Sequence, residues 1–382
     1  MKSVIIIGTA FPLRGGLAAY NERLARELLG QGHRVVIFTF SLQYPSFLFP
    51  GKSQYSQSPP PEGLDIRVRI NSINPLNWIS TGMEIRSLRP DLVIVKFWIP
   101  FMGPSLGTLL RIIRLRRHTR VVSILDNVIP HEKRFADRAF TKYFFRPVDA
   151  FVAMSRQVMQ ELSRFSSKPV SLVAHPLYDN YGPPVARVSA RDQLQLPREG
   201  RYLLFFGFIR AYKGLDLLLE AMADPRLSGI NLIIAGECYE DRDRYEALWS
   251  VPSLKGRISL FTDFIPADQV RYFFCAADLV VQPYRSATQS GISQIAFQYE
   301  KPMIVTRVGG LAEIIKDRIN GLVCEPNPPS IVAAIAAYFS EGLEPVLTEN
   351  LRQEKSRYGW DPMVREILRL AFEPSKPKPD HS

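Results

Sequence analysis

Short apolar runs alternate with amphipathic stretches along the whole chain. Residues 4–8 (VIIIG) are apolar at consecutive positions, as expected for a parallel strand that is buried on both faces. A stretch with helical spacing of its apolar residues follows at 17–29 and ends at Gly30 and Gly32. This alternation predicts a doubly wound α/β sheet. Further strands are predicted at 34–40, 91–98, 120–127 and 150–155.

The segment between the second and third predicted strands differs in composition. Residues 44–75 are rich in Ser, Pro, Gln and aromatic side chains. We interpret this segment as a long loop. Loops of that length within a compact domain usually have a function or are mobile.

The strand–helix pattern begins again in the second half of the chain. Residues 178–200 carry several prolines and charges without clear periodicity, which indicates a linker at 181–200. We therefore predict an N-terminal domain at 1–180 and a C-terminal domain at 201–358, and we expect the low-complexity tail, 373–382, to be disordered. The predicted strands of the second domain lie at 202–207, 231–236, 257–265, 278–284 and 302–306.

Length and composition are those of an ordinary two-domain globular protein. The chain has 382 residues, of which 46% are hydrophobic and 22% charged. No apolar run reaches the ~18–20 residues that cross a bilayer, and the N-terminus reads as a first strand rather than a signal peptide. Three widely spaced cysteines indicate neither a disulfide framework nor a metal cluster. These features favour the cytoplasm.

The net charge points to an anionic partner. Lys and Arg number 48 against 37 Asp and Glu, which gives +11. Nucleic acid, anionic lipid and phosphorylated small molecules all remain possible, although no nucleic-acid recognition motif is present. The region around 109–120 is predicted to form an amphipathic helix with a cationic face, either packed on the sheet with its charges in solvent or contacting the anionic inner leaflet. Its basic residues are Arg111, Arg114, Arg116, Arg117 and Arg120.

The first candidate site is the loop GTAFPLRGG at 8–16, between the first strand and the first helix. Its adjacent glycines, Gly15 and Gly16, allow close backbone approach, and free N–H groups at a helix start suit an anion or a polar substrate. The loop matches neither GxGxxG nor a Walker motif, which disfavours a dehydrogenase or a P-loop NTPase. A tight strand-to-helix turn without further function remains the alternative.

The second candidate site follows the first strand of the second domain. Arg210 and Lys213 lie three residues apart at the start of an apolar-periodic helix, and Gly214 comes next. Two cations beside a helix N-terminus form a site for a diphosphate and stabilise the charge that grows as a phosphate leaves. The alternative is that both side chains are simply solvated.

The third candidate site is the loop and helix region at 283–315. Backbone N–H groups at a helix start suit phosphate oxygens, and amide side chains suit the hydroxyls of a sugar. A second Gly-Gly turn then opens another short helix. The candidates are Ser290, Gly291 and Ile292 for phosphate, and Gln289, Gln294 and Glu313 for the sugar or ribose.

Together these segments resemble the retaining GT-B glycosyltransferases of family 4 over nearly the full chain. The Gly-Gly loop, RAYKG, the loop before IAFQYEKPMIV and VGGLAEII occur in that family's order and spacing. The resemblance implies two Rossmann-like domains facing across a cleft, with a C-terminal helix at 359–372 that crosses back to the first domain. It implies that Arg210 and Lys213 bind the donor diphosphate, and that Gly15 and Gly16 line the acceptor side.

One departure from the family pattern concerns donor recognition. The family usually has two glutamates separated by seven residues in the third loop. Alignment on Lys301 and Pro302 puts Ala287 and Ile295 at those positions. The nearby amides at 289 and 294 are possible substitutes, because an amide oxygen still accepts from a hydroxyl. The loop SATQSGISQIA resembles a variant found in some bacterial relatives, which favours a working enzyme over an inactive one.

Candidate catalytic residues follow the strand at 120–127. Members of the family often carry a His near this strand end that contacts the transferred sugar. Asp126 and Asn127 take that place here, and His131 comes four residues later. His175 is interpreted as structural. No metal is expected, because the resemblance gives its role to the two cations at 210 and 213, and the acidic run ECYEDRDRYE at 237–246 is interpreted as solvated helical surface.

The predicted function is transfer of a sugar from a nucleotide-diphosphate sugar to an acceptor hydroxyl, with retention of configuration. The acceptor is expected to be a glycan or lipid-linked glycan of the cell envelope, and no cofactor is expected. The protein would lie in the cytoplasm, with a possible peripheral contact on the inner membrane face and no nucleic acid as partner. Two alternatives stay open: a nucleotide-sugar epimerase of GT-B fold, and an inactive GT-B binding module.

Overall fold

The chain folds into two compact units. The computed structural model describes residues 1–45, 48–49, 53–129, 135–240 and 242–373. Unit 1 contains the described residues up to Pro176 together with those from Gly359 onward, and unit 2 runs from Leu177 to Tyr358. The N-terminal unit therefore includes the C-terminal helix of the chain, α14 (Trp360–Phe372). The rest of the predicted disordered tail, 374–382, lies outside the described residues.

The predicted linker at 181–200 is instead part of unit 2. It contains a helix, α6 (Arg187–Gln193). Two of its charged residues are tied to the sheet: the half-buried Arg187 and the buried Arg191 both pair with Asp278, at 2.7 and 3.1 Å. The interpretation of 181–200 as a linker was wrong. Its charged residues seemed to indicate solvent exposure, but two of them anchor α6 to the sheet of unit 2.

The sheet of unit 1 has seven parallel strands among the described residues, in the order β3-β2-β1-β4-β5-β6-β7. The central strands are apolar at consecutive positions because helices cover both faces. Ile6 of β1, for example, aligns with Ile37 of β2 and Ile94 of β4, and all three are buried. The strands are β1 (Ser3–Ile7), β2 (Arg34–Leu42), β3 (Asp65–Asn71), β4 (Leu92–Phe97), β5 (Arg120–Leu125), β6 (Ala150–Ala153) and β7 (Val170–Leu172).

The five strands predicted for this unit are present, but the two edge strands were missed. β3 lies inside the segment that was interpreted as a loop, 44–75. As the outermost strand it is mostly solvent-accessible, and its sequence DIRVRIN alternates apolar and polar residues rather than forming an apolar run. β7, at the opposite edge, has three residues and carries too little pattern to detect.

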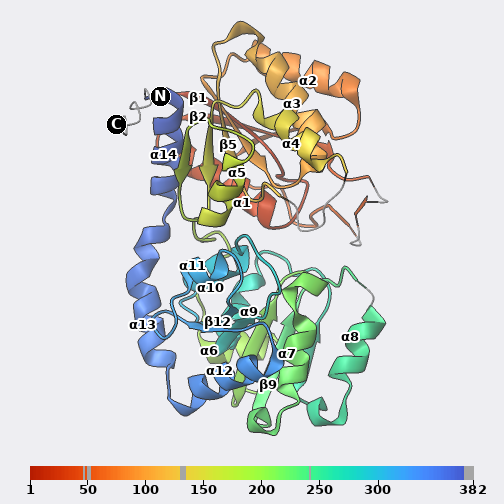
Figure 1. Cartoon of the computed structure of the whole chain (residues 1–382), viewed down its shortest axis with the longest axis vertical. Coiled ribbons are helices and arrows are strands. Elements are labelled where there is room, and N and C mark those ends of the chain that lie inside the picture. Colours follow the sequence, from red (N-terminus) through yellow and green to blue (C-terminus); the bar gives the residue numbers. More distant parts are fainter. Residues whose placement is uncertain (46–47, 50–52, 130–134, 241, 374–382) are drawn as a thin grey trace. The chain divides into compact units, whose positions relative to one another are not determined.

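Two helical layers enclose this sheet. On one face α2, α3 and α4 contact each other in sequence, and on the other face α1 contacts α14 (Figure 1). The helices of unit 1 are α1 (Gly16–Gly30), α2 (Pro75–Ser87), α3 (Gly103–Ile113), α4 (Asp137–Phe145), α5 (Arg156–Ser163) and α14, with 3₁₀ turns η2 (Pro100–Met102) and η3 (Arg114–Arg116).

The predicted cationic helix at 109–120 does not exist as a single helix. α3 ends at Ile113, a 3₁₀ turn follows, and residue 120 begins β5. The Arg111 guanidinium donates to the carbonyls of Gly107 and Tyr143, and Arg114 pairs with Asp149 at 2.7 Å. These arginines hold the α3–α4 layer together, so this stretch presents no continuous cationic face.

Unit 2 repeats the design with six parallel strands among its described residues, ordered β10-β9-β8-β11-β12-β13. Its five predicted strands are present, and the three-residue β13 was missed. The strands are β8 (Arg201–Phe206), β9 (Ile230–Ala235), β10 (Ile258–Phe261), β11 (Leu279–Gln282), β12 (Met303–Thr306) and β13 (Leu322–Cys324). The helices are α6, α7 (Leu215–Met222), α8 (Arg242–Trp249), α9 (Val270–Ala276), α10 (Gly291–Gln298), α11 (Leu311–Ile314), α12 (Pro328–Ser340) and α13 (Glu344–Glu354), with 3₁₀ turns η4 (Ala211–Lys213), η5 (Pro225–Leu227), η6 (Pro252–Leu254) and η7 (Lys355–Tyr358).

Within the described ranges, no single helix combines the length and hydropathy of a membrane span. Pro328–Ser340 taken with Glu344–Phe372 meets the length and composition test, but the pair is bent by 97°.

The first prediction concerns α14 and its attachment to unit 1. The Trp360 side chain is buried, with its ring 4.9 Å from that of Tyr20. We expect Trp360→Ala to lower the free energy of unfolding by about 3–5 kcal/mol, because a large aromatic side chain leaves a cavity. Urea denaturation measures this loss.

Phe372→Ala, in the last turn of the same helix, is the matched control. Phe372 is 38% exposed, so its removal should cost less than about 1 kcal/mol. Equal losses of stability in the two variants would contradict the conclusion that the buried Trp360 side chain attaches α14 to unit 1.

Candidate active site

The loop after β8 is shaped by a glycine that no other residue can replace. Gly214 has φ +67°, and a Cβ there would lie 2.0 Å from the carbonyl oxygen of Pro283. The missing side chain lets the 3₁₀ turn η4 pack directly on the end of β11. Arg210 and Lys213, the predicted diphosphate ligands, flank this turn at its start and end.

Lys213 is a buried cation without an anionic partner. Its side chain is only 7% exposed, and within the described part of the chain neither Lys213 nor Arg210 forms an ion pair. Burial, together with the neighbouring Arg210 charge, lowers the pKa of Lys213 to about 7. A Cβ on Gly207 would lie 2.7 Å from the Lys213 ammonium and 3.3 Å from the Ile292 side chain, so the cation and the first turn of α10 converge there.

An arginine that the sequence analysis did not consider holds this loop in place. The Arg285 backbone N–H donates to the Tyr212 carbonyl (2.7 Å), and its guanidinium donates to the Ala211 carbonyl (3.1 Å). The same guanidinium makes two bonds to Asp216, at 2.6 and 2.9 Å. Burial alone would raise the pKa of Asp216, but the bonds to Arg285 and the charge of Arg244 more than offset this and lower it. Asp216 is therefore ionised and fixes Arg285 rather than binding a ligand.

A second support comes from the acidic segment after β9, and it corrects an expectation. Residues 237–246 were interpreted as solvated helical surface, but α8 begins only at residue 242 and Glu237 is buried. Glu240 accepts from the backbone N–H of Ala211 (2.6 Å) and from the Tyr245 hydroxyl (3.0 Å). Among the described residues, no group of three His, Cys, Asp or Glu side chains is placed to hold a metal ion.

Part of the hydrogen-bonding capacity of the loop before α10 is used within the chain. Ser290 caps α10, and its hydroxyl accepts from the backbone N–H of Ile292 at 3.2 Å. That N–H, predicted to face phosphate, already has a partner within the chain. Gly291 is the first residue of α10, Gln289 is half-buried in the preceding loop, and Glu313 is exposed in the first turn of α11.

Gln294 stands out among the amides of this region. Its side chain is completely buried, yet within the described residues neither its amide nitrogen nor its amide oxygen has a hydrogen-bond partner. Gln282, equally buried in β11, is paired with the Ser293 hydroxyl at 3.1 Å. An unsatisfied buried polar group costs about 1–3 kcal/mol, so the fold alone gives no reason for an amide at this position.

In unit 1 the carboxyl ends of β4 and β5 bring together a pair that the sequence analysis only half identified. Asp126, a predicted catalytic residue, pairs with Lys96 at 3.2 Å. The buried Lys96 ammonium also lies 3.2 Å from the ring centre of Tyr20. Burial lowers the pKa of Lys96, and Asp126 partly offsets that effect. The signal in the sequence was a lysine inside the apolar run DLVIVKFW.

The other predicted residues of unit 1 have different outcomes. Asn127 is half-buried after Asp126, and His131 lies outside the described residues. His175 is buried and bonded to the Pro176 carbonyl (2.7 Å), and burial lowers its pKa to about 3, so it is neutral and structural as predicted. Gly15, with φ +102°, and the exposed Gly16 begin α1, and a Cβ on Gly15 would meet open space.

Comparisons with known proteins match both halves of the chain. Residues 15–177 match the family model described as glycosyl transferase 4-like domain, and residues 200–341 match that of glycosyl transferases group 1. The D-inositol 3-phosphate glycosyltransferase of Xylanimonas cellulosilytica is 25% identical over 248 residues, which are 60% of this chain and 58% of that protein. The lipopolysaccharide 1,2-N-acetylglucosaminetransferase of Salmonella typhimurium is 28% identical over 190 residues, covering 46% and 49%. The chain thus spans about half the length of the curated relatives it matches.

Solved structures resemble the chain over almost its full length. The structure of HepE from Anabaena in complex with UDP-glucose has a TM-score of 0.73 at 15% identity and covers 96% of this chain and 98% of its own. The fold is GT-B. The predicted fold class, two doubly wound Rossmann-like domains, is confirmed. The GT-B fold and the two family matches together support a GT-B glycosyltransferase.

The second prediction concerns the charge of Lys213. An unfolded lysine keeps its proton up to its ordinary pKa of 10.5, whereas Lys213 in the ligand-free protein loses its proton near pH 7. The unfolded chain therefore binds more protons between these values, and the contribution of Lys213 to stability rises with pH across that window. We expect Lys213→Met to stabilise the ligand-free protein at pH 6 by more than about 1 kcal/mol, since one pKa unit corresponds to about 1.4 kcal/mol.

Urea denaturation at pH 6 and pH 9 measures this difference. The advantage of the Met variant should shrink at the higher pH, because the wild-type ammonium has by then lost its charge. If the two proteins differed in stability by the same amount at pH 6 and pH 9, folding would not lower the pKa of Lys213.

The third prediction compares the two buried glutamines. Gln294→Leu removes an amide without partners and should leave the ligand-free protein as stable as wild type, or more stable by about 1 kcal/mol. Gln282→Leu leaves the Ser293 hydroxyl unpaired and should destabilise it by about 1–3 kcal/mol. Urea denaturation of both variants tests this ordering, and the opposite ordering would show that Gln294 has a structural role.

Proposed function

We propose that the chain transfers a sugar from a nucleotide-diphosphate sugar to an acceptor hydroxyl, with Arg210 and Lys213 binding the donor diphosphate. The proposal rests on the buried Lys213 ammonium, which has no carboxylate partner among the described residues. Burial and the neighbouring charge of Arg210 lower the pKa of this lysine to about 7, so its charged form is costly in the ligand-free protein. A bound diphosphate compensates this charge. HepE, which has the same fold, has been crystallised with UDP-glucose, and this supports a donor of that class.

The proposed reaction is a front-face displacement with retention of configuration. The bond between the anomeric carbon and the diphosphate oxygen breaks while the acceptor oxygen attacks the same face of the sugar. The acceptor proton passes to the departing phosphate oxygen. The two cations stabilise the negative charge that grows on the diphosphate, a function that needs a fixed position more than acid–base chemistry. Arg285 and Glu240 supply that position by holding the loop from both sides.

Recognition of the sugar or ribose is assigned to the amides near α10. Alignment on Lys301 and Pro302 puts Ala287 and Ile295 at the positions of the two glutamates usual in the family, and both side chains are buried and apolar. Gln294, buried and without a partner among the described residues, offers both a donor and an acceptor for hydroxyls. We assign the neighbouring Gln289 to the same role.

The acceptor side is assigned to unit 1. The start of α1 at Gly15 and Gly16 has no bulky side chain, and the pair Lys96–Asp126 lies at the strand ends of the sheet in the same unit. Asp126 pairs with Lys96 at 3.2 Å, so we assign it to hydrogen bonding with a sugar or acceptor hydroxyl rather than to nucleophilic attack.

We further propose a glycan or lipid-linked glycan of the cell envelope as acceptor, bound at the inner face of the membrane. One relative is named as a lipopolysaccharide N-acetylglucosaminetransferase, and the net charge of +11 favours an anionic surface. We assign no metal, because in this proposal Arg210 and Lys213 neutralise the diphosphate in place of a divalent ion.

The alternatives predict different behaviour. An epimerase would convert the donor without any acceptor, and an inactive module would bind a partner without turnover. Neither is favoured, because both family models that match the chain are glycosyltransferase models. Incubation of labelled donors with and without acceptor glycans separates transfer from epimerisation.

The fourth prediction tests the diphosphate site directly. A nucleotide diphosphate at about 100 times its Kd should add about 2.7 kcal/mol of apparent stability. We expect Arg210→Ala with Lys213→Ala to abolish this gain, because both cations that face the anion are removed. Thermal shift with a panel of UDP, GDP and ADP measures it.

Arg226→Ala with Arg242→Ala is the control of equal charge change. These arginines lie on exposed parts of unit 2 and pair with Asp224 and Glu246. The control should keep the full nucleotide response. Unchanged nucleotide binding by the double variant at 210 and 213 would refute the assignment.

A further inference from the structure

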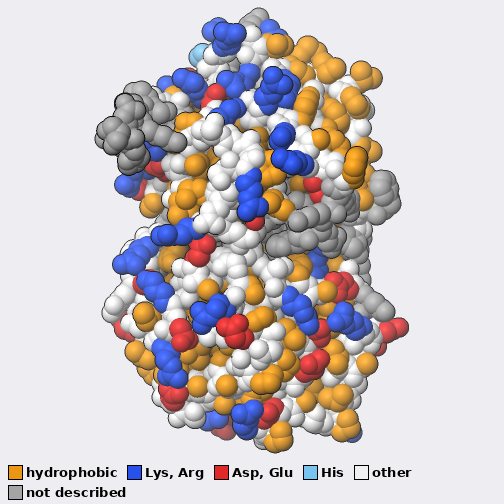
Figure 2. Space-filling view, viewed as in Figure 1, with side chains coloured by type: hydrophobic (Ala, Val, Ile, Leu, Met, Phe, Trp, Pro, Cys, Tyr) orange, Lys and Arg blue, Asp and Glu red, His pale blue; other side chains and the backbone are white. Residues whose placement is uncertain are grey.

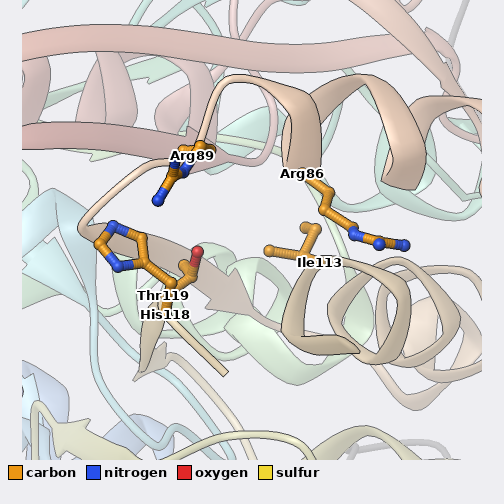
Figure 3. A pocket seen from close by; sticks show the side chains of 5 residues that line it. All are labelled: Arg86, Arg89, Ile113, His118 and Thr119. Carbon is orange, nitrogen blue, oxygen red and sulfur yellow. The ribbon is translucent and has the colours of Figure 1, made fainter. Parts of the chain in front are cut away.

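A basic pocket lies at the edge of unit 1 where β4 and β5 begin, opposite the strand ends that carry Lys96 and Asp126. It has a volume of about 370 Å³. Figure 3 shows Arg89 and His118 pointing toward one another across it, with Ile113 between the helices that enclose it. The pocket is lined by Arg86, Arg89, Ile113, His118 and Thr119.

The charges of this pocket are not balanced from within. Arg86 and Arg89 form no ion pair among the described residues. The nearest carboxylate, Asp91, does not line the pocket; it accepts from the Ser3 backbone N–H and lies 4.0 Å from both Lys2 and His118. Figure 3 shows the Arg89 guanidinium turned toward His118, while the Arg86 guanidinium points away from both. Arg89 and His118 therefore face a phosphate in the pocket, and the Arg86 charge lies beside it; a guanidinium binds phosphate through charge-assisted hydrogen bonds.

An apolar stripe leads along α2 to the same pocket. Leu76, Ile79, Met83 and Arg86 follow the spacing i, i+3, i+7 and i+10, so they share one helical face. This face is turned to solvent, with Leu76 77% and Met83 52% exposed. Figure 2 shows hydrophobic side chains gathered over α2, with Lys and Arg side chains beside them on the neighbouring part of unit 1. Leu88, between the two arginines of the pocket, is exposed as well.

We propose that this surface, the α2 stripe with the Arg86–Arg89 pocket, docks unit 1 on an anionic phospholipid membrane. The pocket takes the phosphate of a lipid headgroup, and Leu76, Ile79 and Met83 enter the boundary between headgroups and acyl chains. The proposal rests on the membrane-bound acceptor proposed above and gives that membrane contact its residues.

The combination of features selects a membrane over a soluble ligand. A soluble phosphate compound needs the cations but gives no reason for three apolar side chains in solvent on the adjoining face. A bilayer accounts for the cations and for the exposed apolar side chains. Helices bind the surface of anionic membranes through apolar side chains that enter the interface and neighbouring arginines that contact the headgroups. The surface also replaces the one predicted from the sequence, since Arg111 and Arg114 are engaged with their own unit.

The test is co-sedimentation of the full chain with vesicles, in the absence of donor and acceptor. Vesicles of phosphatidylcholine alone are compared with equal parts of phosphatidylcholine and phosphatidylglycerol. We expect binding to the anionic vesicles only, weakened by salt and reduced at least about tenfold by Arg86→Gln with Arg89→Gln. Leu76→Ser with Met83→Ser should also reduce binding, while Ile319→Ser with Val346→Ser, two comparably exposed positions of unit 2, should not.

Arg226→Gln with Arg242→Gln carries the same change in net charge and should bind the vesicles as wild type does. Equal loss in this control, or full binding by the Arg86 and Arg89 variant, overturns the proposal. Stabilisation by inorganic phosphate that depends on Arg86 and Arg89, without vesicle binding, overturns the lipid as ligand and assigns the pocket to a soluble phosphate. The thermal shift with nucleotide diphosphate, measured on the same variants, reports the donor site separately, so failure of one proposal is distinguished from failure of the other.

Discussion

The structure of unit 2 is organised around one uncompensated charge, the ammonium of Lys213. A buried cation without a partner is costly, and a protein that could relax would turn the side chain to solvent. Here the surroundings prevent it. Gly214 allows η4 to pack on the end of β11, and Arg285 and Glu240 bind the backbone of Ala211 from two directions. The contacts of this loop hold the cation at a buried position, where loss of its proton or, as we propose, a bound anion relieves the cost.

The contrast with Lys96 shows why the missing partner matters. Both lysines are buried at strand ends of a parallel sheet, and burial lowers the pKa of each. Lys96 has Asp126 at 3.2 Å and the ring of Tyr20 beside it, so its charge is compensated within the fold. Lys213 has no ion pair among the described residues: the charge of Arg210 lies nearby, and the ring centre of Tyr284 lies 5.6 Å from its ammonium. A buried lysine is thus paired with a carboxylate in unit 1 and has no carboxylate partner among the described residues of unit 2, where we propose that it binds a ligand.

The sequence predicted those features that depend on neighbouring positions along the chain. Continuous apolar runs identified the central strands, because such runs are a local pattern. The spacing of Arg210, Lys213 and Gly214, also a local pattern, predicts a donor loop, and this stays a prediction. Edge strands such as β3 were missed because one solvated side removes the apolar run. Arg285, Lys96 and the lack of a partner for Gln294 were not predictable, since each depends on contacts between segments far apart in sequence. The predicted cationic helix failed for the same reason: composition gave the arginines, but not that two of them bind their own unit.

Stability and function are opposed at the donor site. We expect Lys213 and Gln294 each to reduce the stability of the ligand-free protein, one through its charge and the other through an amide without a partner among the described residues. Hydrophobic replacements at both positions would fit the surrounding core better, so the fold alone does not account for their presence. In the proposed complex an anionic group of the ligand lies at Lys213 and its hydroxyls bind Gln294. Both desolvation costs of the ligand-free protein are then removed, and their removal contributes to the affinity of the ligand. A nucleotide-diphosphate sugar carries both groups in one molecule.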